Sequence, residues 1–245
     1  MTPSLPRRVV AEFAGTLFLL AAVVGSGIMA ERLAAGNVAL ALLANTIATG
    51  AALVGFLLAF GPISGAHLNP AVTLTDAWQG GIAWREAPAY IAAQITGAFA
   101  GVATAHLMFG VPLFFASTHA RSGPAQLFSE FVATFGLLSV IWGCVRHRPA
   151  AVPFAVGAYI TAAYWFTAST SFANPAVTLA RSASNTFAGI RPADVAGFVA
   201  AQLAGAFAAT LLFRWLFPSL NAEASAITVE QTSNDNPDIP SPPSD

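Results

Sequence analysis

The hexapeptide Asn69-Pro70-Ala71-Val72-Thr73-Leu74 recurs letter for letter as Asn174-Pro175-Ala176-Val177-Thr178-Leu179. Asn is a preferred N-cap residue, and Pro at the first helical position has the required φ and loses only an N–H that would be unpaired. Each copy therefore predicts the start of a helix. The apolar stretches that follow, 69–78 and 174–184, are about ten residues long. At 1.5 Å per residue each rises about 15 Å, half of the hydrocarbon thickness of a bilayer, so neither can span a membrane.

The composition indicates an integral membrane protein. Of the 245 residues, 56% are hydrophobic and 9% charged, against about a quarter charged in a typical soluble domain, and the mean hydropathy is +0.67. The ten basic residues are all Arg and the net charge is −1, which argues against a nucleic-acid-binding surface. The single cysteine, Cys144, excludes an intrachain disulfide, and no Cys/His cluster predicts a metal site.

Six apolar runs approach the roughly 20 residues that a membrane-spanning helix needs. They are Val9–Ala30, Val38–Phe60, Ala87–Phe109, Ala125–Val145, Val152–Ala168 and Ala193–Phe217. The distribution of arginines favours a cytoplasmic N-terminus at residues 1–8 and an extracytoplasmic connecting loop at 110–124. Residues 218–245 are acidic, rich in proline and poor in apolar side chains, which predicts a disordered cytoplasmic tail.

The chain consists of two similar halves, 9–109 and 125–217, each with three spans and one copy of the hexapeptide. Because three is odd, the second half must enter the membrane from the opposite side, which makes the repeat inverted. We therefore expect an all-α membrane protein of six transmembrane helices and two re-entrant half-helices in an inverted 3+3 repeat. The half-helices are expected to meet N-terminus to N-terminus in the middle of the membrane.

With these features the sequence resembles the aquaporin and aquaglyceroporin family, which is characterised by two Asn-Pro-Ala loops in a six-span inverted repeat. The stretch Ser64–Thr73 is very close to that family's first loop, and the resemblance covers about residues 8–217. It implies a homotetramer of independently conducting pores in the cell (inner) membrane, with no cofactor and no catalytic residue. It also implies that Glu12 and Glu130 hold the re-entrant loops by accepting their backbone N–H groups. His67 is expected either to line the pore on the cytoplasmic side or to be a packed residue bonded to the loop backbone.

General physics supports a channel for neutral solutes. Two facing helix N-termini place positive dipole ends at the pore centre, where they repel cations and protons. The amides of Asn69 and Asn174 can donate hydrogen bonds to a passing oxygen atom, and a water molecule that accepts from both interrupts the proton-relay chain.

The expected selectivity filter departs from the family pattern. Family members usually carry Arg directly after the second Asn-Pro-Ala, where this chain has Val177; counting back from the two Asn residues without gaps assigns the other filter positions to Thr49, Ala162 and Ser171. None of the four is aromatic or charged, which predicts a wide, nearly neutral aperture that passes water, glycerol-sized polyols and similar solutes. This filter resembles that of aquaglyceroporins from bacterial arsenic-resistance operons, which implies neutral arsenous acid as a further solute.

Arg181 lies about one helical turn beyond Val177 on a similar face. Two interpretations of it remain open. It is either a cation in the outer vestibule that attracts anionic solutes, or an arginine whose side chain reaches the lipid headgroups.

Two other classes of function would place different demands on the sequence. A coupled secondary transporter also uses inverted repeats and broken helices, but it requires titratable or ion-binding groups at the midplane, where the sequence offers two amides. An intramembrane enzyme requires paired catalytic groups, but His67 and Ser171 belong to loops that enter from opposite faces.

Overall fold

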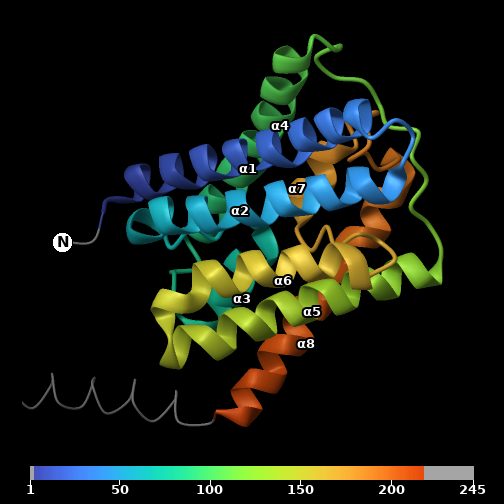
Figure 1. Cartoon of the computed structure of the whole chain (residues 1–245). Coiled ribbons are helices and arrows are strands. Elements are labelled where there is room, and N and C mark those ends of the chain that lie inside the picture. Colours follow the sequence, from blue (N-terminus) through green and yellow to red (C-terminus); the bar gives the residue numbers. More distant parts are fainter. Residues whose placement is uncertain (1–2, 218–245) are drawn as a thin grey trace, which may run out of the picture. The chain divides into compact units, whose positions relative to one another are not determined.

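A computed structural model describes residues 3–217, so the predicted tail at 218–245 lies outside the described residues. The described chain folds into eight α-helices (Figure 1). They are α1 (Leu5–Leu33), α2 (Val38–Ser64), α3 (Pro70–Gln79), α4 (Ala87–Phe109), α5 (Pro124–His147), α6 (Val152–Phe166), α7 (Pro175–Arg181) and α8 (Val195–Leu216). Every feature discussed below belongs to the compact unit Met1–Thr210; residues 211–216 are the final turns of α8.

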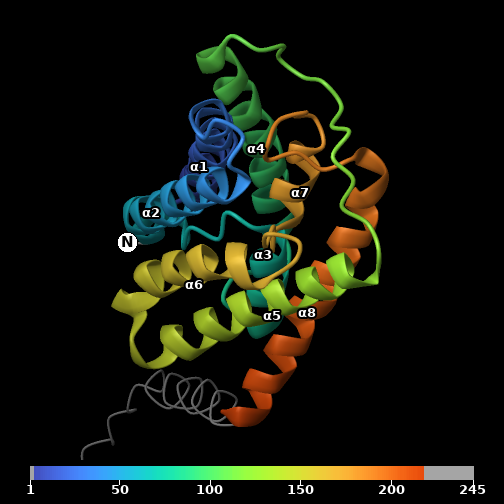
Figure 2. The same cartoon turned by 45° about the vertical axis from the view of Figure 1, so that its right-hand side comes forward.

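The expected fold class is confirmed, with six longer helices and two short ones. Five helical segments are long and apolar enough to cross a membrane, namely α1, α2, α4, α5 and the Pro192–Leu216 segment that contains α8. The remaining long helix, α6, has 15 residues and rises about 22 Å. It is therefore shorter than the predicted span Val152–Ala168, and the 3₁₀ turn Pro149–Ala151 precedes it. Figures 1 and 2 show α1 beside α2 and α5 beside α6.

The short helices α3 and α7 lie among the longer ones (Figure 2). Both begin at the proline that follows the N-cap asparagine, as predicted. Helix α7 ends at Arg181, three residues before the predicted limit of 184. Beyond Arg181 the backbone carbonyl groups bond to the connecting loop instead of continuing the helix. The carbonyl oxygen of Ser182 accepts from the N–H of Ser117, and that of Ala183 accepts from the N–H of Phe115.

Glycines allow the long helices to approach closely at repeat-related positions. A Cβ atom at Gly97 of α4 would overlap the carbonyl oxygen of Phe13 in α1, and a Cβ atom at Gly205 of α8 would overlap that of Phe131 in α5. Small residues at helix contacts are typical of membrane proteins, where backbone proximity provides the packing energy. These close contacts set the positions of the long helices around α3 and α7.

Candidate pore

The two half-helices meet at their N-terminal ends. The Asn69 side-chain amide donates to the carbonyl oxygen of Ala173 at 2.8 Å, and that of Asn174 donates to the carbonyl oxygen of Leu68 at 2.7 Å. Each Asn Oδ1 atom also caps its own helix, accepting from the N–H of Ala71 or Ala176. An amide nitrogen carries two protons, so each Asn retains one N–H after these bonds.

A buried carboxylate supports each re-entrant loop. Glu12 Oε1 accepts from the backbone N–H of His67 at 2.9 Å, and Oε2 accepts from that of Leu68 at 2.7 Å. Glu130 accepts from the backbone N–H groups of Phe172 and Ala173, both at 2.9 Å. Charge-assisted bonds of this kind are about twice as strong as neutral ones, so the matched pairs compensate for burying the two carboxylates.

The backbone of both loops takes the same unusual conformation. Ala66 and Leu68 have φ values of +46° and +48°, and the equivalent residues Ser171 and Ala173 have +51° and +49°. Left-handed backbone costs a non-glycine residue about 1–2 kcal/mol. Such turns present successive N–H groups to one anion, and each carboxylate described above accepts two of them.

Two glutamines connect these carboxylates to the half-helices. Gln94 Nε2 donates to Glu12 Oε2 and to Thr73 Oγ1, both at 2.8 Å. Gln202 Nε2 donates likewise to Glu130 Oε2 at 2.5 Å and to Thr178 Oγ1 at 2.8 Å. The sequence repeat is therefore also a repeat of one hydrogen-bond network.

A cavity of about 280 Å³ lies beside the meeting point of the half-helices. Both capping asparagines line it. Much of its remaining wall is aliphatic and comes from α1, α2, α5 and α6: Leu19, Val23, Leu53, Leu57, Leu137, Ile141, Val145, Val152, Val156 and Ile160. The same cavity is thus lined by two amide donors and by aliphatic side chains from four helices.

Three of the four predicted filter residues lie on this cavity, namely Thr49, Ser171 and Val177. Ala162 does not, because its side chain is on the exposed side of α6. Instead Tyr164 lines the cavity, and its hydroxyl lies 3.4 Å from Thr49 Oγ1. Ala162 and Tyr164 are two residues apart, which corresponds to about 200° around the axis of α6, so counting without gaps reached the opposite face of the helix.

The structure places Arg181 in the wall of the cavity and not at the lipid headgroups. Its side chain is 2% exposed, so it does not extend to lipid headgroups, and it is part of the cavity wall. The guanidinium carbon lies 3.4 Å from the ring centroid of Phe172, and Nε donates to the carbonyl oxygen of Ala188. The sequence predicted a nearly neutral aperture. The cavity wall near Val177 is instead charged, because the Arg181 guanidinium lines the same cavity.

A second arginine holds the loop from its other side. Arg121, in the connecting loop, lies 5.0 Å from the Phe172 ring centroid and donates to the carbonyl oxygens of Gly189 and Ser169 at 2.8 and 3.1 Å. Burial lowers the pKa of the Arg121 guanidinium below its usual value. Phe172 thus contacts two cations through its ring.

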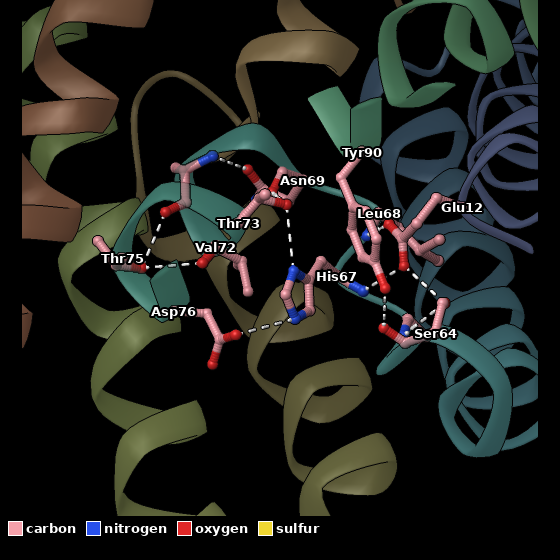
Figure 3. A network of polar contacts seen from close by, with 12 residues as sticks. Glu12, Ser64, His67, Leu68, Asn69, Val72, Thr73, Thr75, Asp76 and Tyr90 are labelled. Atoms are coloured by element: carbon pink, nitrogen blue, oxygen red, sulfur yellow. Dashed lines mark hydrogen bonds and ion pairs between the residues drawn. The ribbon is translucent and has the colours of Figure 1, made fainter. Parts of the chain in front are cut away.

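His67 lies on the cavity together with an acidic residue that the sequence reasoning did not single out. His67 Nδ1 is 3.1 Å from Thr73 Oγ1, and Nε2 is 3.6 Å from Asp76 Oδ2 (Figure 3). Asp76 and His67 both line the cavity. The internal repeat could have pointed to Asp76. Counted from the Asn of each hexapeptide, Asp76 in the first half takes the position that Arg181 takes in the second half.

Comparisons with known proteins agree with this geometry. A model of the family described as major intrinsic protein matches residues 1–162 and 145–237. The chain is 60% identical over 212 residues to aquaglyceroporin AqpS of Rhizobium meliloti (strain 1021), covering 86% of this chain and 91% of the relative. It is 36% identical to aquaporin NIP1-3 of Oryza sativa subsp. japonica, covering 84% and 73%. Its fold matches the X-ray structure of the aquaglyceroporin from Plasmodium falciparum with a TM-score of 0.68 at 21% identity, covering 89% of this chain and all of that one.

Proposed function

The chain belongs to the major intrinsic protein family and is an integral membrane channel rather than an enzyme, and from this premise we propose that it passes water, glycerol-sized polyols and comparably small uncharged solutes. Flow through it is passive and follows the solute gradient. The capping amides of Asn69 and Asn174 and the filter residues Thr49, Ser171 and Val177 are the groups that we propose to contact the solute.

One observation carries this proposal: two asparagine amides and a set of aliphatic side chains line the same cavity. A polyol has hydroxyl groups along one side and C–H groups along the other. Such a molecule can accept hydrogen bonds from Asn69 and Asn174 while its carbon atoms contact the leucines and valines of the wall. An inorganic cation would lose its hydration shell against that wall, and the amide N–H groups and the helix N-termini could not replace it.

The missing arginine at position 177 supports solutes larger than water. Val177 has an isopropyl group where the family usually has a guanidinium, and this removes five donors and a bulky side chain from that level. Neutral arsenous acid carries three hydroxyl groups on one centre and resembles glycerol in hydroxyl count. We include it among the proposed solutes on this chemical likeness.

The same family membership supports three further proposals. The channel assembles as a homotetramer in the cell (inner) membrane, with both termini cytoplasmic and residues 110–124 extracytoplasmic. Glu12 and Glu130 support the re-entrant loops through the bonds described above. The half-helix N-termini supply the positive potential that opposes cations and protons at the pore centre.

Stopped-flow measurements on liposomes that contain the purified protein test the proposal. We expect water and glycerol to cross faster than through protein-free liposomes, at a rate that proton and sodium ionophores leave unchanged. Dependence of uptake on either ion gradient would instead favour a coupled transporter. Neutral arsenite measured in the same liposomes tests the third solute separately.

A further inference from the structure

The cavity carries one acidic side chain, and its position mirrors that of the buried arginine. Asp76 is the seventh residue after Asn69, and Arg181 is the seventh residue after Asn174. Both side chains line the cavity. Because the half-helices run apart from their meeting point, each charge lies about 10 Å from its own N-cap, toward opposite ends of the pore.

The electrostatics of the pore would favour anions if this carboxylate were absent. Two helix N-termini point at the centre, and helix N-termini are ready-made anion sites. Arg181 adds a full positive charge to the wall, and it forms no salt bridge within residues 3–217. Asp76 is the only acidic residue among those that line the cavity in the described chain. It is therefore the group able to oppose anions there.

His67 is the neighbour of the Asp76 carboxylate in the cavity wall. Its Nδ1 lies 3.1 Å from Thr73 Oγ1, which also lies 3.1 Å from the carbonyl oxygen of Asn69 and accepts from Gln94. Its Nε2 lies 3.6 Å from Asp76 Oδ2 (Figure 3), so no direct hydrogen bond joins the imidazole to the carboxylate.

Gly81 provides the space for the carboxylate. A Cβ atom at Gly81 would overlap both carboxylate oxygens of Asp76, and the Gly81 N–H donates to the Asp76 carbonyl oxygen at 2.9 Å. The carboxylate thus lies between the turn that follows α3 and the imidazole of His67.

We propose that Asp76 is a specificity-determining residue of the pore: its negative charge excludes anions that the rest of the pore attracts. A neutral hydroxylated solute is not repelled by the carboxylate, whereas an anion meets a like charge there. This inference rests on the proposed channel function and adds a selectivity that the Asn-Pro-Ala motifs do not provide.

Asp76→Asn tests the inference because it removes the charge and keeps the shape. The measurements are water and glycerol flux in liposomes and nitrate conductance in planar bilayers of the same protein. We expect Asp76→Asn to retain water flux and to raise nitrate conductance at least about tenfold over the wild type. Asp76→Glu, which keeps the charge, and Glu31→Gln, which removes an exposed charge elsewhere, are expected to leave nitrate excluded.

The outcomes distinguish a failure of the proposed channel function from a failure of the inference about Asp76. A wild-type protein that conducts no glycerol contradicts the proposed function. A wild-type protein that conducts glycerol, together with an Asp76→Asn variant whose water flux is normal and whose nitrate conductance is unchanged, overturns the inference about Asp76. If Asp76→Asn does not fold, Asp76→Ser serves as the neutral variant under the same two expectations.

Discussion

Arg181 lies one helical turn beyond Val177 in α7, and both side chains line the same cavity. The protein therefore carries a cation one helical turn beyond Val177, the position of the proposed filter at which family members usually have arginine. The guanidinium is held against Phe172 and the carbonyl oxygen of Ala188. At position 177 the cavity wall is an isopropyl group, which leaves room for a solute.

Val177→Arg is expected to restrict the pore. A second guanidinium at this level removes open cross-section and places two like charges close together. We expect glycerol flux in liposomes to fall at least about tenfold, equivalent to about 1.4 kcal/mol in barrier height, while water flux falls much less. Val177→Leu, which adds volume without charge, is the control and should have the smaller effect. Unaltered glycerol flux in the arginine variant would show that residue 177 is not in the filter.

Glu130→Gln is expected to destabilise the second re-entrant loop. The replacement puts an amide NH₂ where one carboxylate oxygen accepts from Phe172 or Ala173, leaving a buried N–H without an acceptor. Losing such a bond costs about 1.5–3 kcal/mol, so the midpoint of thermal unfolding in detergent should fall by several degrees. Glu31→Gln removes an exposed carboxylate and should not change the midpoint. Equal midpoints for the two variants would rule out the loop-supporting role.

Gly97→Ala is expected to destabilise the contact between α1 and α4. The added methyl group would overlap the backbone carbonyl of Phe13, and overpacking typically costs about 1–3 kcal/mol. Gly55→Ala is a matched control, because Gly55 is also inside a helix but a Cβ atom there meets nothing within 4 Å. Thermal unfolding should separate the two variants, and the account fails at this point if Gly97→Ala is as stable as the wild type.

Arg121→Ala is expected to loosen the loop between α6 and α7. Arg121 bonds to the Ser169 carbonyl oxygen and contacts the Phe172 ring, and neither interaction can be made by alanine. Hydrogen exchange of the backbone amides at 169–173 should speed up relative to the wild type. Arg32→Ala, which alters an exposed arginine at the end of α1, should leave exchange in this loop unchanged.

The sequence alone predicted the architecture because the repeat and the chain lengths are strong constraints. Two identical hexapeptides start helices at Pro70 and Pro175, as the capping preferences of Asn and Pro require. Apolar runs predicted the long helices, although α2 extends through Pro62 to Ser64, beyond its predicted end at Phe60. A proline so close to a helix end removes one hydrogen bond without breaking the remaining turns.

The details of the site could be predicted less well from the sequence. Ala162 was misplaced because counting without gaps fixes a position in the sequence and not a face of α6: Tyr164, which lines the cavity, is two residues further along the chain and about 200° around the helix axis. Arg181 was assigned to a vestibule or to lipid headgroups because its partners, Phe172 and Ala188, are contacts of the folded chain. Asp76 was not singled out because sequence reasoning compared the identical residues of the repeats and not their differing ones.

The central claim is that two half-helices frame an open, passive path for neutral hydroxylated solutes. Glycerol efflux from liposomes containing the purified wild-type protein, with proton and sodium gradients abolished by ionophores, tests it most directly. The account predicts efflux well above that of protein-free liposomes and unaffected by the ionophores. Efflux no faster than from protein-free liposomes, or efflux that stops when the gradients are abolished, would contradict it.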